Sequence, residues 1–310
     1  MAIFSDIAKI KVSSCPFLVN FRGIVYICMI WNKYMKSFMA WFLRNVLHYR
    51  SDVVMVNLSR SFPQKSYEEI REIYKRFYLH LVTVFTEMLW FGTCRGERGC
   101  KKLHRSRLVE FSNPETYNRL AAGARQVMIL ESHTGNWELI GGVLNYSYGE
   151  PLDIAPDRMA ITYLRLHNSL ADRFMARNRT GVLKHLGFQG YLEAGQVMRF
   201  ALEHRAEKYC YCFITDQFPY TAKRQNVEFL HQETPTMTGA ASLAVKLDMA
   251  VGYLRFECRE GGGYRLTVVP ICEHAAGQDP AQIMKRYYQL LEEDLEKQPW
   301  NYLWTHKRWK

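Results

Sequence analysis

The sequence predicts an α/β protein in which a mixed, largely parallel sheet is flanked by helices and preceded by a helical N-terminal part. Two observations support this prediction. From about residue 112, short apolar strands alternate with helical segments, as in parallel sheets covered by helices. Residues 12–48 are instead rich in Phe, Trp, Tyr, Met, Val and Ile, as expected at a membrane interface. We therefore divide the chain into an N-terminal membrane-associating segment, residues 1–48, and a main domain, residues 49–310.

The N-terminal segment is expected to lie in a membrane interface rather than to span a bilayer. Within its aromatic-rich part, residues 12–48, four basic residues interrupt the apolar ones: Arg22, Lys33, Lys36 and Arg44. Its longest windows without a charge, 12–21 and 23–32, are ten residues each. A spanning helix needs roughly 18–20 apolar residues. The segment also lacks the cleavage site of a secretory signal peptide, so export by that route is not expected.

A long helix is predicted to open the main domain. Ser66 precedes Glu69 by three residues, which is the pattern of a capping box at a helix start. The helix should run to about Trp90, with one apolar face formed by Ile70, Tyr74, Phe77, Leu81 and Phe85. Residues 95–107 then carry six Lys or Arg side chains. Such a run is either a solvated helix face or a surface for phosphates and anionic lipid.

The α/β part follows in a regular order. A short helix begins at Asn113-Pro114-Glu115 and ends at Gly123, and a strand covers 126–131. The next predicted elements are a helix from about Trp137, a strand near 152–155, helices over 161–176 and 194–206, a strand over 209–215 and a helix over 239–247. Strands over 250–258 and 264–271 flank Gly261-Gly262-Gly263, which indicates a hairpin toward one edge of the sheet. An amphipathic helix over 280–298 closes the domain.

The charge balance points to an anionic partner. The chain has 41 Lys and Arg residues against 30 Asp and Glu residues, a formal net charge of +11. This excess suits nucleic acid, an anionic membrane surface, or a phosphorylated or carrier-bound substrate. Nucleic acid is not expected, because the sequence has no helix-turn-helix, RNP-type or zinc-knuckle pattern. The eight cysteines include no C-x-x-C pair, which indicates a reducing compartment and no metal site.

The stretch LESHTGNWE, residues 130–138, places a histidine and a glutamate directly after a predicted strand. Ligand sites in open α/β sheets lie at the carboxyl ends of strands, where His133 falls. On one regular helix, the five-residue spacing would point His133 and Glu138 about 140° apart. Gly135 permits a tight loop instead, so the carboxylate can fold back and fix the imidazole tautomer. His133 would then act as a general base on a hydroxyl. The alternative is a packed loop histidine.

Arg177 and Arg179 follow at a predicted helix end as further catalytic candidates. A guanidinium there can stabilise a developing oxyanion or hold an acceptor phosphate. The helix macrodipole alone also favours a basic residue at this position, which is the alternative explanation. Because residues two apart on a helix point about 200° from each other, we expect one arginine to face the site and the other to face solvent.

Five residues are candidates for substrate binding: Asn136, Asp216, Gln217, Thr238 and Gly239. Asn136 lies in the same turn as His133. Asp216 and Gln217 follow a predicted strand, so their side chains can position Arg179 or the acceptor at the carboxyl edge of the sheet. A cap of a helix or turn is the alternative for Asp216.

Thr238 and Gly239 are candidates because they stand at the start of a predicted helix. The free N–H groups of a helix N-terminus can receive a phosphate or a thioester oxygen. A plain N-cap is the alternative for Thr238. No cofactor is expected for this site.

An H-x4-E pattern after a strand resembles the signature of glycerolipid acyltransferases. Five further stretches resemble one branch of them, the bacterial late acyltransferases of lipid A biosynthesis, in the lysophospholipid acyltransferase superfamily. In chain order they are NLSRSFP at 57–63, RNRTG at 177–181, TDQ at 215–217, FLHQETPTMTG at 229–239 and LWTHKRW at 303–309. The resemblance covers roughly residues 45–310 and implies a glycerolipid acyltransferase-like fold.

The resemblance also implies an activity. A fatty acyl chain would pass from a thioester, on acyl carrier protein or acyl-CoA, to a hydroxyl of a lipid A precursor or related membrane glycolipid. The implied location is the cytoplasmic face of the inner membrane. A lysophospholipid or aminolipid acceptor stays an alternative, as does water, which would make the protein a thioesterase. Family members usually begin with a continuous apolar anchor, whereas charges break the first 48 residues here, so the mode of attachment stays open.

Overall fold

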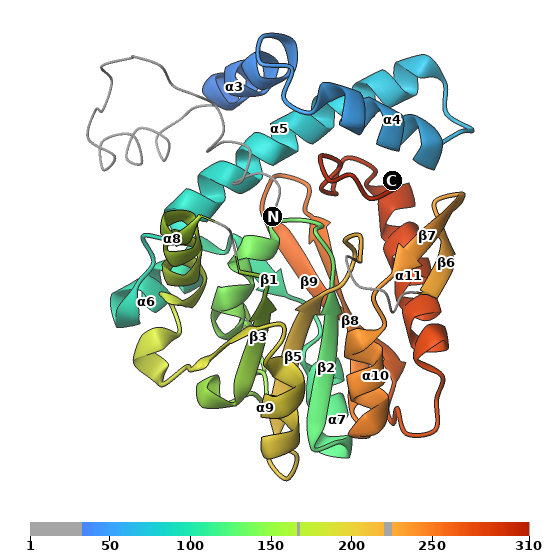
Figure 1. The fold of residues 1–310 in the computed structure, drawn as a ribbon. Coiled ribbons are helices and arrows are strands. Elements are labelled where there is room, and N and C mark those ends of the chain that lie inside the picture. The colour runs from blue at the N-terminus through green and yellow to red at the C-terminus, as the bar shows by residue number, and fades with distance from the viewer. Residues whose placement is uncertain (1–32, 166–167, 220–224, 310) are drawn as a thin grey trace.

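The computed structural model describes residues 33–165, 168–219 and 225–309, which contain one seven-stranded sheet and one two-stranded hairpin. The strand order in the large sheet is β1-β9-β8-β2-β5-β3-β4 (Figure 1). These strands are β1 (Val109–Phe111), β2 (Gln126–Glu131), β3 (Met159–Tyr163), β4 (Gly190–Glu193), β5 (Tyr209–Ile214), β8 (Ala250–Cys258) and β9 (Tyr264–Cys272). All neighbours are parallel except β8 and β9, which form an antiparallel pair. The predicted fold class is confirmed.

The strand β2 lies in the middle of the sheet, between β8 and β5. All six of its residues are buried, as expected for a strand covered on both faces. Its bounds match the predicted strand over 126–131. The predicted hairpin is also present, because Gly261, Gly262 and Gly263 have φ values of 83°, 108° and 75° in the turn between β8 and β9. These are left-handed conformations that glycine adopts without strain.

Helices cover both faces of the sheet. One face packs against α7 (Pro114–Gly123) and the 3₁₀ helix η1 (Trp137–Asn145). The other packs against α10 (Gly239–Lys246) and α11 (Pro280–Lys297). Side chains alternate across the central strand, so Val127 and Ile129 join the first core and Met128 joins the second.

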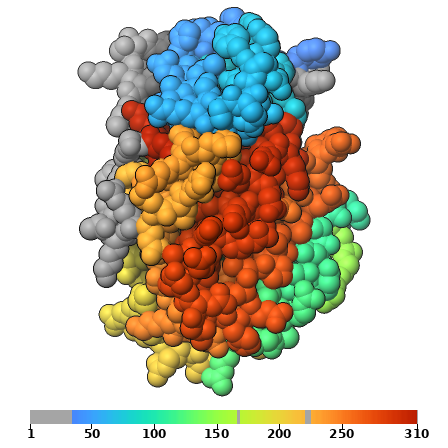
Figure 2. Space-filling model, turned by 90° about the vertical axis from the view of Figure 1, so that its right-hand side faces the viewer, coloured from blue at the N-terminus to red at the C-terminus, as the bar shows by residue number. Residues whose placement is uncertain are grey.

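The N-terminal helices lie across the carboxyl edge of the sheet (Figure 1). They are α3 (Lys33–Asn45), α4 (Ser51–Ser61) and the long α5 (Tyr67–Phe91), and α6 (Gly96–Ser106) follows at the side of the sheet. The predicted capping box is present at the start of α5, since Ser66 and Glu69 exchange both bonds. The amide of Asn57 on α4 donates to the carbonyl oxygens of Trp304 and His306, at 2.8 and 2.9 Å. Figure 2 shows the resulting contact, with the blue helices resting on the red C-terminal segment.

The structure corrects the predictions between residues 152 and 206. No strand forms at 152–155. The strand is β3, which follows the short helix η2 (Pro156–Arg158), and the predicted helix over 161–176 begins later as α8 (Ser169–Thr180). The predicted helix over 194–206 shortens to α9 (Val197–Glu203), behind β4 and the short helix η3 (Lys184–Leu186), which were not predicted. The sequence of this region is compatible with a helix or a strand. Its backbone pairing with β5 makes residues 159–163 a strand, β3.

A second missed feature is the hairpin of β6 (Gln225–Phe229) and β7 (Gln232–Thr236), which pair in antiparallel register. Its strands consist mostly of Gln, Asn, Glu, Thr and Pro, and the apolar alternation is limited to Val227 and Phe229, which is too short to predict a strand pair.

The charge-free windows 12–21 and 23–32 lie outside the described residues, as do Arg22 and most of the predicted 1–48 segment. Within the described part of the chain, no helix combines the length and the apolar character needed to cross a membrane.

Candidate active site

His133 and Asp216 meet at the carboxyl edge of the sheet. The register of the parallel strands β2 and β5 pairs Glu131 with Ile214, so the segments that follow the two strands leave the sheet side by side. His133 lies two residues beyond Glu131, and Asp216 lies two residues beyond Ile214. Their Nδ1 and Oδ1 atoms are 2.7 Å apart. Both residues are buried, with 6% and 1% of their surface exposed. The predicted position of His133 at a strand end is thus observed, but its carboxylate partner comes from the neighbouring strand.

The two ring nitrogens of His133 have different partners. Burial acts to raise the pKa of Asp216, but the charge and hydrogen bond of His133 outweigh it and hold this pKa below its ordinary value. An ionised Asp216 accepts the Nδ1 proton, so in the neutral form of the imidazole Nε2 is the acceptor. The side-chain nitrogen of Gln217 lies 3.1 Å from that Nε2 atom. Asp216 and Gln217, predicted to bind substrate or position Arg179, both contact the imidazole instead.

The predicted pairing of Glu138 with His133 is wrong. Glu138 forms a two-bond ion pair with Arg179, with Nε to Oε2 at 2.7 Å and Nη2 to Oε1 at 2.6 Å. Burial acts to raise the pKa of Glu138, but Arg179 outweighs it and the pKa lies below the ordinary value. A guanidinium offers this carboxylate two charge-assisted bonds, whereas an imidazole already bonded to Asp216 offers none. Glu138 therefore pairs with Arg179 and not with the ring.

Trp137 connects the two pairs. Its ring packs edge-on against the His133 ring, with centroids 5.0 Å apart and an interplanar angle of 69°. Its Nε1 atom donates to Glu138 Oε1 at 3.0 Å. The Glu138–Arg179 pair thus holds the indole that packs against the imidazole, and it supports His133 from a distance rather than by direct contact.

The two arginines of α8 point in different directions, as the helix geometry predicts. Arg179 donates to the hydroxyl of Tyr191 at 3.1 Å as well as to Glu138. The Tyr191 ring stacks on Tyr163 with centroids 4.0 Å apart. With most of its donors engaged, Arg179 is a structural partner here rather than a free ligand for phosphate or oxyanion. Arg177 is exposed, and its side chain forms no hydrogen bond or ion pair with another described residue.

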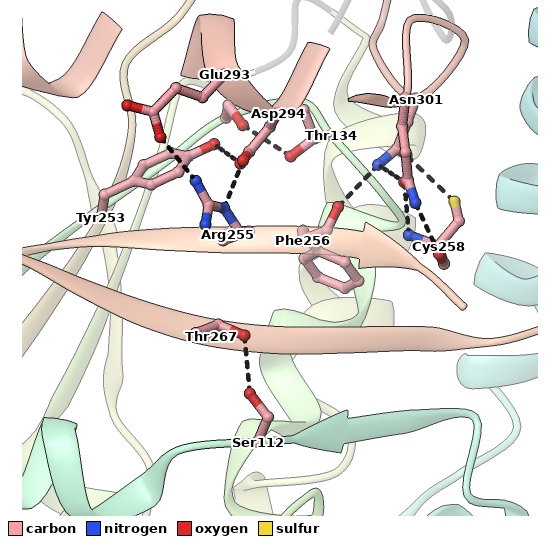
Figure 3. A network of polar contacts seen from close by, with 12 residues as sticks. Ser112, Thr134, Tyr253, Arg255, Phe256, Cys258, Thr267, Glu293, Asp294 and Asn301 are labelled. Atoms are coloured by element: carbon pink, nitrogen blue, oxygen red, sulfur yellow. Dashed lines mark hydrogen bonds and ion pairs between the residues drawn. The ribbon is translucent and has the colours of Figure 1, made fainter. Parts of the chain in front are cut away.

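The loop after His133 needs its glycine. Gly135 has φ +58°, and a Cβ atom there would come within 2.1 Å of the Phe256 ring. Asn301 secures this residue, because its Oδ1 atom accepts from the Gly135 amide at 2.7 Å and its Nδ2 atom donates to the Phe256 carbonyl at 2.8 Å. Figure 3 shows Asn301 between Phe256 and Cys258, bonded to the end of β8. A ring nitrogen of His80 on α5 lies 3.2 Å from the Gly135 carbonyl oxygen.

Asn136 is buried and faces α5 rather than open space. Its Nδ2 atom donates to Glu87 Oε2 at 3.1 Å and to the Val84 carbonyl at 3.3 Å. The Tyr264 hydroxyl donates to the same Glu87 oxygen at 2.7 Å. These bonds of the amide nitrogen fasten the loop to the long helix, and a role of Asn136 in substrate binding stays a prediction.

The C-terminal segment completes the site and was not predicted to do so. Thr134 and Tyr302 form an antiparallel bridge, and the Leu303 amide donates to the His133 carbonyl at 3.1 Å. Asn301 belongs to the same segment. The sequence signal was the LWTHKRW ending, which marked the region without showing that it pairs with the histidine loop.

Thr238 and Gly239 stand at the N-terminus of α10, as predicted. Thr238 occupies the N-cap position without a side-chain cap bond, and Gly239 is exposed. The structure shows no contact between them and His133, so their role in substrate binding stays a prediction. In the described ranges, no group of three or more His, Cys, Asp or Glu residues could hold a metal ion.

The fold and the site together define the class of protein. The sheet is mostly parallel, and at its carboxyl edge a buried histidine has a carboxylate on one ring nitrogen and an acceptor position on the other, the arrangement of an enzymatic general base. The family model described as bacterial lipid A biosynthesis acyltransferase matches residues 17–310, and the chain belongs to this family. It is an enzyme that transfers acyl groups. A search among curated proteins finds no match.

Proposed function

We propose that this acyltransferase moves a fatty acyl chain from a thioester, on acyl carrier protein or acyl-CoA, to a hydroxyl of a lipid A precursor. His133 is the general base. The observation that supports this role is the pair of contacts to its ring, with Asp216 at 2.7 Å from Nδ1 and Gln217 at 3.1 Å from Nε2. One nitrogen is thereby anchored, and the other holds a lone pair at the carboxyl edge of the sheet.

The reaction needs two proton transfers, one to His133 and one from it. The acceptor hydroxyl enters the position that the Gln217 amide occupies and gives its proton to His133 Nε2. Its oxygen attacks the thioester carbonyl, so a C–O bond forms and the carbonyl electrons move onto oxygen. When this intermediate collapses, the C–S bond breaks and the departing thiolate takes the proton from Nε2. Asp216 stabilises the imidazolium between the two transfers.

Glu138 and Arg179 act as positioning residues in this mechanism. They hold Trp137 against the imidazole, so the ring of His133 is fixed by Asp216 at one edge and by the indole at its side. Arg177 and the α10 start at Thr238 and Gly239 remain candidates for contacts to substrate.

The acceptor would be reached at the cytoplasmic face of the inner membrane through α3. This helix exposes aromatic residues to solvent, with Tyr34 78%, Phe38 56% and Trp41 48% exposed. An amphipathic helix of this kind lies in the membrane interface with its apolar face in lipid. Arg44 in its last turn and Lys36 add attraction to an anionic leaflet.

Mass spectrometry of total lipids from cells with and without the gene tests the proposal. We expect one acyl increment to be missing from one lipid A species in the deletion strain. Complementation with His133→Ala should fail to restore it. An unchanged lipid A with an altered phospholipid or aminolipid would contradict the acceptor, and free fatty acid as the only product of the purified enzyme would contradict transfer.

A further inference from the structure

The helix α6 and its flanks carry a concentrated positive charge. Between residues 95 and 107 there are six Lys or Arg residues and one acidic residue, Glu97. We call five of these the basic surface: Arg95, Arg98, Lys101, Lys102 and Arg105. All five are exposed. Among the described residues only Lys101 of this set forms an ion pair, with Glu97. The surface therefore keeps a large uncompensated charge.

The helix presents these charges on one side. Arg98 and Arg105 are seven residues apart, with Lys101 and Lys102 between them, so they follow one helix face. The opposite face is packed, since Leu103 is completely buried and the Cys100 thiol donates to the Val182 carbonyl at 3.5 Å. Because this packing holds the helix, the basic surface is a fixed array rather than a disordered run.

Two of its members are held by neighbours and two are free to reach a partner. Lys102 donates to the Thr93 hydroxyl at 2.8 Å and lies 5.3 Å above the centre of the Trp90 ring. Arg95 donates to the Gly92 carbonyl at 2.9 Å. The side chains of Arg98 and Arg105 make no hydrogen bond or ion pair with another described residue, so their guanidinium groups are available.

The basic surface adjoins the end of α8, the helix that supports the active site. The amide of Gly96 donates to the carbonyl of Gly181 at 3.4 Å, and the Arg95 side chain lies beside Gly181. Gly181 follows directly after α8, which carries Arg179 of the ion pair with Glu138. In Figure 1, α6 and α8 lie on the same side of the molecule, away from α11. A partner on this surface would therefore be close to the helix end that supports the site.

The surface does not have the features of a lipid or nucleic acid site. A helix that inserts into lipid needs an exposed apolar face, but the large apolar side chain of α6, Leu103, is buried in the core. The exposed aromatic residues gather on α3 instead. Binding of single-stranded nucleic acid needs open aromatic rings for stacking, whereas Trp90 and Tyr148 are each covered by a basic side chain. A folded acidic protein fits this polar surface best.

We propose that the basic surface docks an acidic protein that bears the acyl thioester, the acyl carrier protein of the proposed reaction. This inference rests on the proposed function and assigns the donor a place on the molecule. The partner's acidic face meets Arg98 and Arg105, while the thioester arm passes the end of α8 toward His133. Complementary charge of this kind speeds encounter and selects the partner.

The test compares two double variants with the same loss of positive charge. Arg98→Glu/Arg105→Glu reverses two charges of the basic surface, and Lys246→Glu/Lys285→Glu reverses two exposed lysines on α10 and α11. Transfer is measured with acyl carrier protein and with a neutral S-acyl-N-acetylcysteamine thioester. At low salt we expect the first variant to raise the KM for the carrier-bound donor by about tenfold or more, with the KM for the neutral thioester unchanged. The control variant should resemble wild type with both donors.

Two results would overturn the docking site: an unchanged KM for the carrier-bound donor, or a loss of binding to phosphatidylglycerol vesicles with no effect on the carrier. A binding measurement separates this inference from the proposed function. His133→Ala protein should bind holo carrier protein, and the charge reversal should weaken that binding at least about tenfold. If the wild-type enzyme transfers no acyl group from any thioester while this binding persists, the proposed function fails and the docking site stands.

Discussion

The Nδ1 atom of His133 and the Oδ1 atom of Asp216 lie 2.7 Å apart, although the residues are 83 positions apart in the chain. The parallel register of β2 and β5 brings them together at one edge of the sheet. The nearer carboxylate, Glu138, is bound by Arg179. This exchange of partners decides which variants should affect the chemistry and which should affect folding.

His133→Ala and Asp216→Ala should each lower kcat/KM for acyl transfer by at least about a hundredfold, because a positioned general base contributes about 10²–10⁴. The two residues act as a unit, so the double variant should be little worse than either single variant. Steady-state kinetics on purified protein with a native circular dichroism spectrum measures this. Near-wild-type turnover by folded His133→Ala protein, or fully additive losses, would remove the mechanism.

Loss of the Glu138–Arg179 pair should mainly reduce stability. Arg179→Ala leaves a buried carboxylate without its partner, at a cost of about 3–5 kcal/mol in the free energy of unfolding. Arg179→Lys should restore only part of it, since an ammonium cannot form both bonds. Arg177→Ala is the matched control on the same helix and should change the free energy by less than about 0.5 kcal/mol. Urea unfolding gives these values, and equal losses at both arginines would contradict the assignment.

The Glu138–Arg179 ion pair should make the free energy of unfolding sensitive to acid. The pKa of Glu138 is lower in the folded protein than its ordinary value of 4.5. The folded state therefore gains stability from the ionised form above pH 4.5 and loses that gain as the pH falls through the lower, folded-state pKa. Glu138→Gln protein should lack this component of its acid unfolding curve.

Gln217→Ala should increase hydrolysis of the acyl thioester in the absence of acceptor. The side-chain amide of Gln217 contacts the His133 Nε2 atom. Removing this amide exposes the lone pair of Nε2 to water. The expected increase is about two- to tenfold, the effect of breaking one hydrogen bond. Release of free fatty acid measures it, with the exposed Gln289→Ala as control. If hydrolysis stays at the wild-type rate and only the KM for acceptor rises, Gln217 binds substrate and does not shield the base.

Glu131→Gln should stabilise the protein at neutral pH. The Glu131 carboxyl is 3% exposed with an unpartnered Oε1 atom, and burial raises its pKa from 4.5 to about 8. Because the folded-state pKa is raised, ionisation opposes folding, and stability falls as the pH rises from about 4.5 to about 8. The neutral amide avoids a cost of up to about 3 kcal/mol at pH 7. Thermal unfolding should show no gain at pH 4, and an equal gain at both pH values would contradict the cause.

Phe38→Ala/Trp41→Ala should weaken attachment to membranes. Both rings are exposed on α3, and truncation of either ring removes apolar contacts with lipid. We expect vesicle binding to fall by about tenfold or more and high salt to release a substantial part of the wild-type protein, because basic residues share the attachment. Tyr67→Ala, at an exposed position of α5, is the control. Unchanged vesicle sedimentation of the double variant would exclude α3 as the docking helix.

Local signals in the sequence determined much of the fold. The capping box at Ser66, the apolar run of β2 and the glycine turn at 261–263 each depend on neighbours along the chain, and each appears where it was predicted. The strand end that carries His133 follows from β2. The hairpin of β6 and β7 escaped prediction because its strands are mostly polar and only Val227 and Phe229 alternate with polar residues.

The partners within the site were decided only by the tertiary structure. Asp216 reaches His133 through the register of β5 on β2, and Asn301 reaches Gly135 from the far end of the chain. An ionised carboxylate pairs with the strongest donor that packing brings within bonding distance, and Arg179 competes for Glu138 with two bonds. Sequence spacing identifies the groups, but it does not contain the distances that settle this competition.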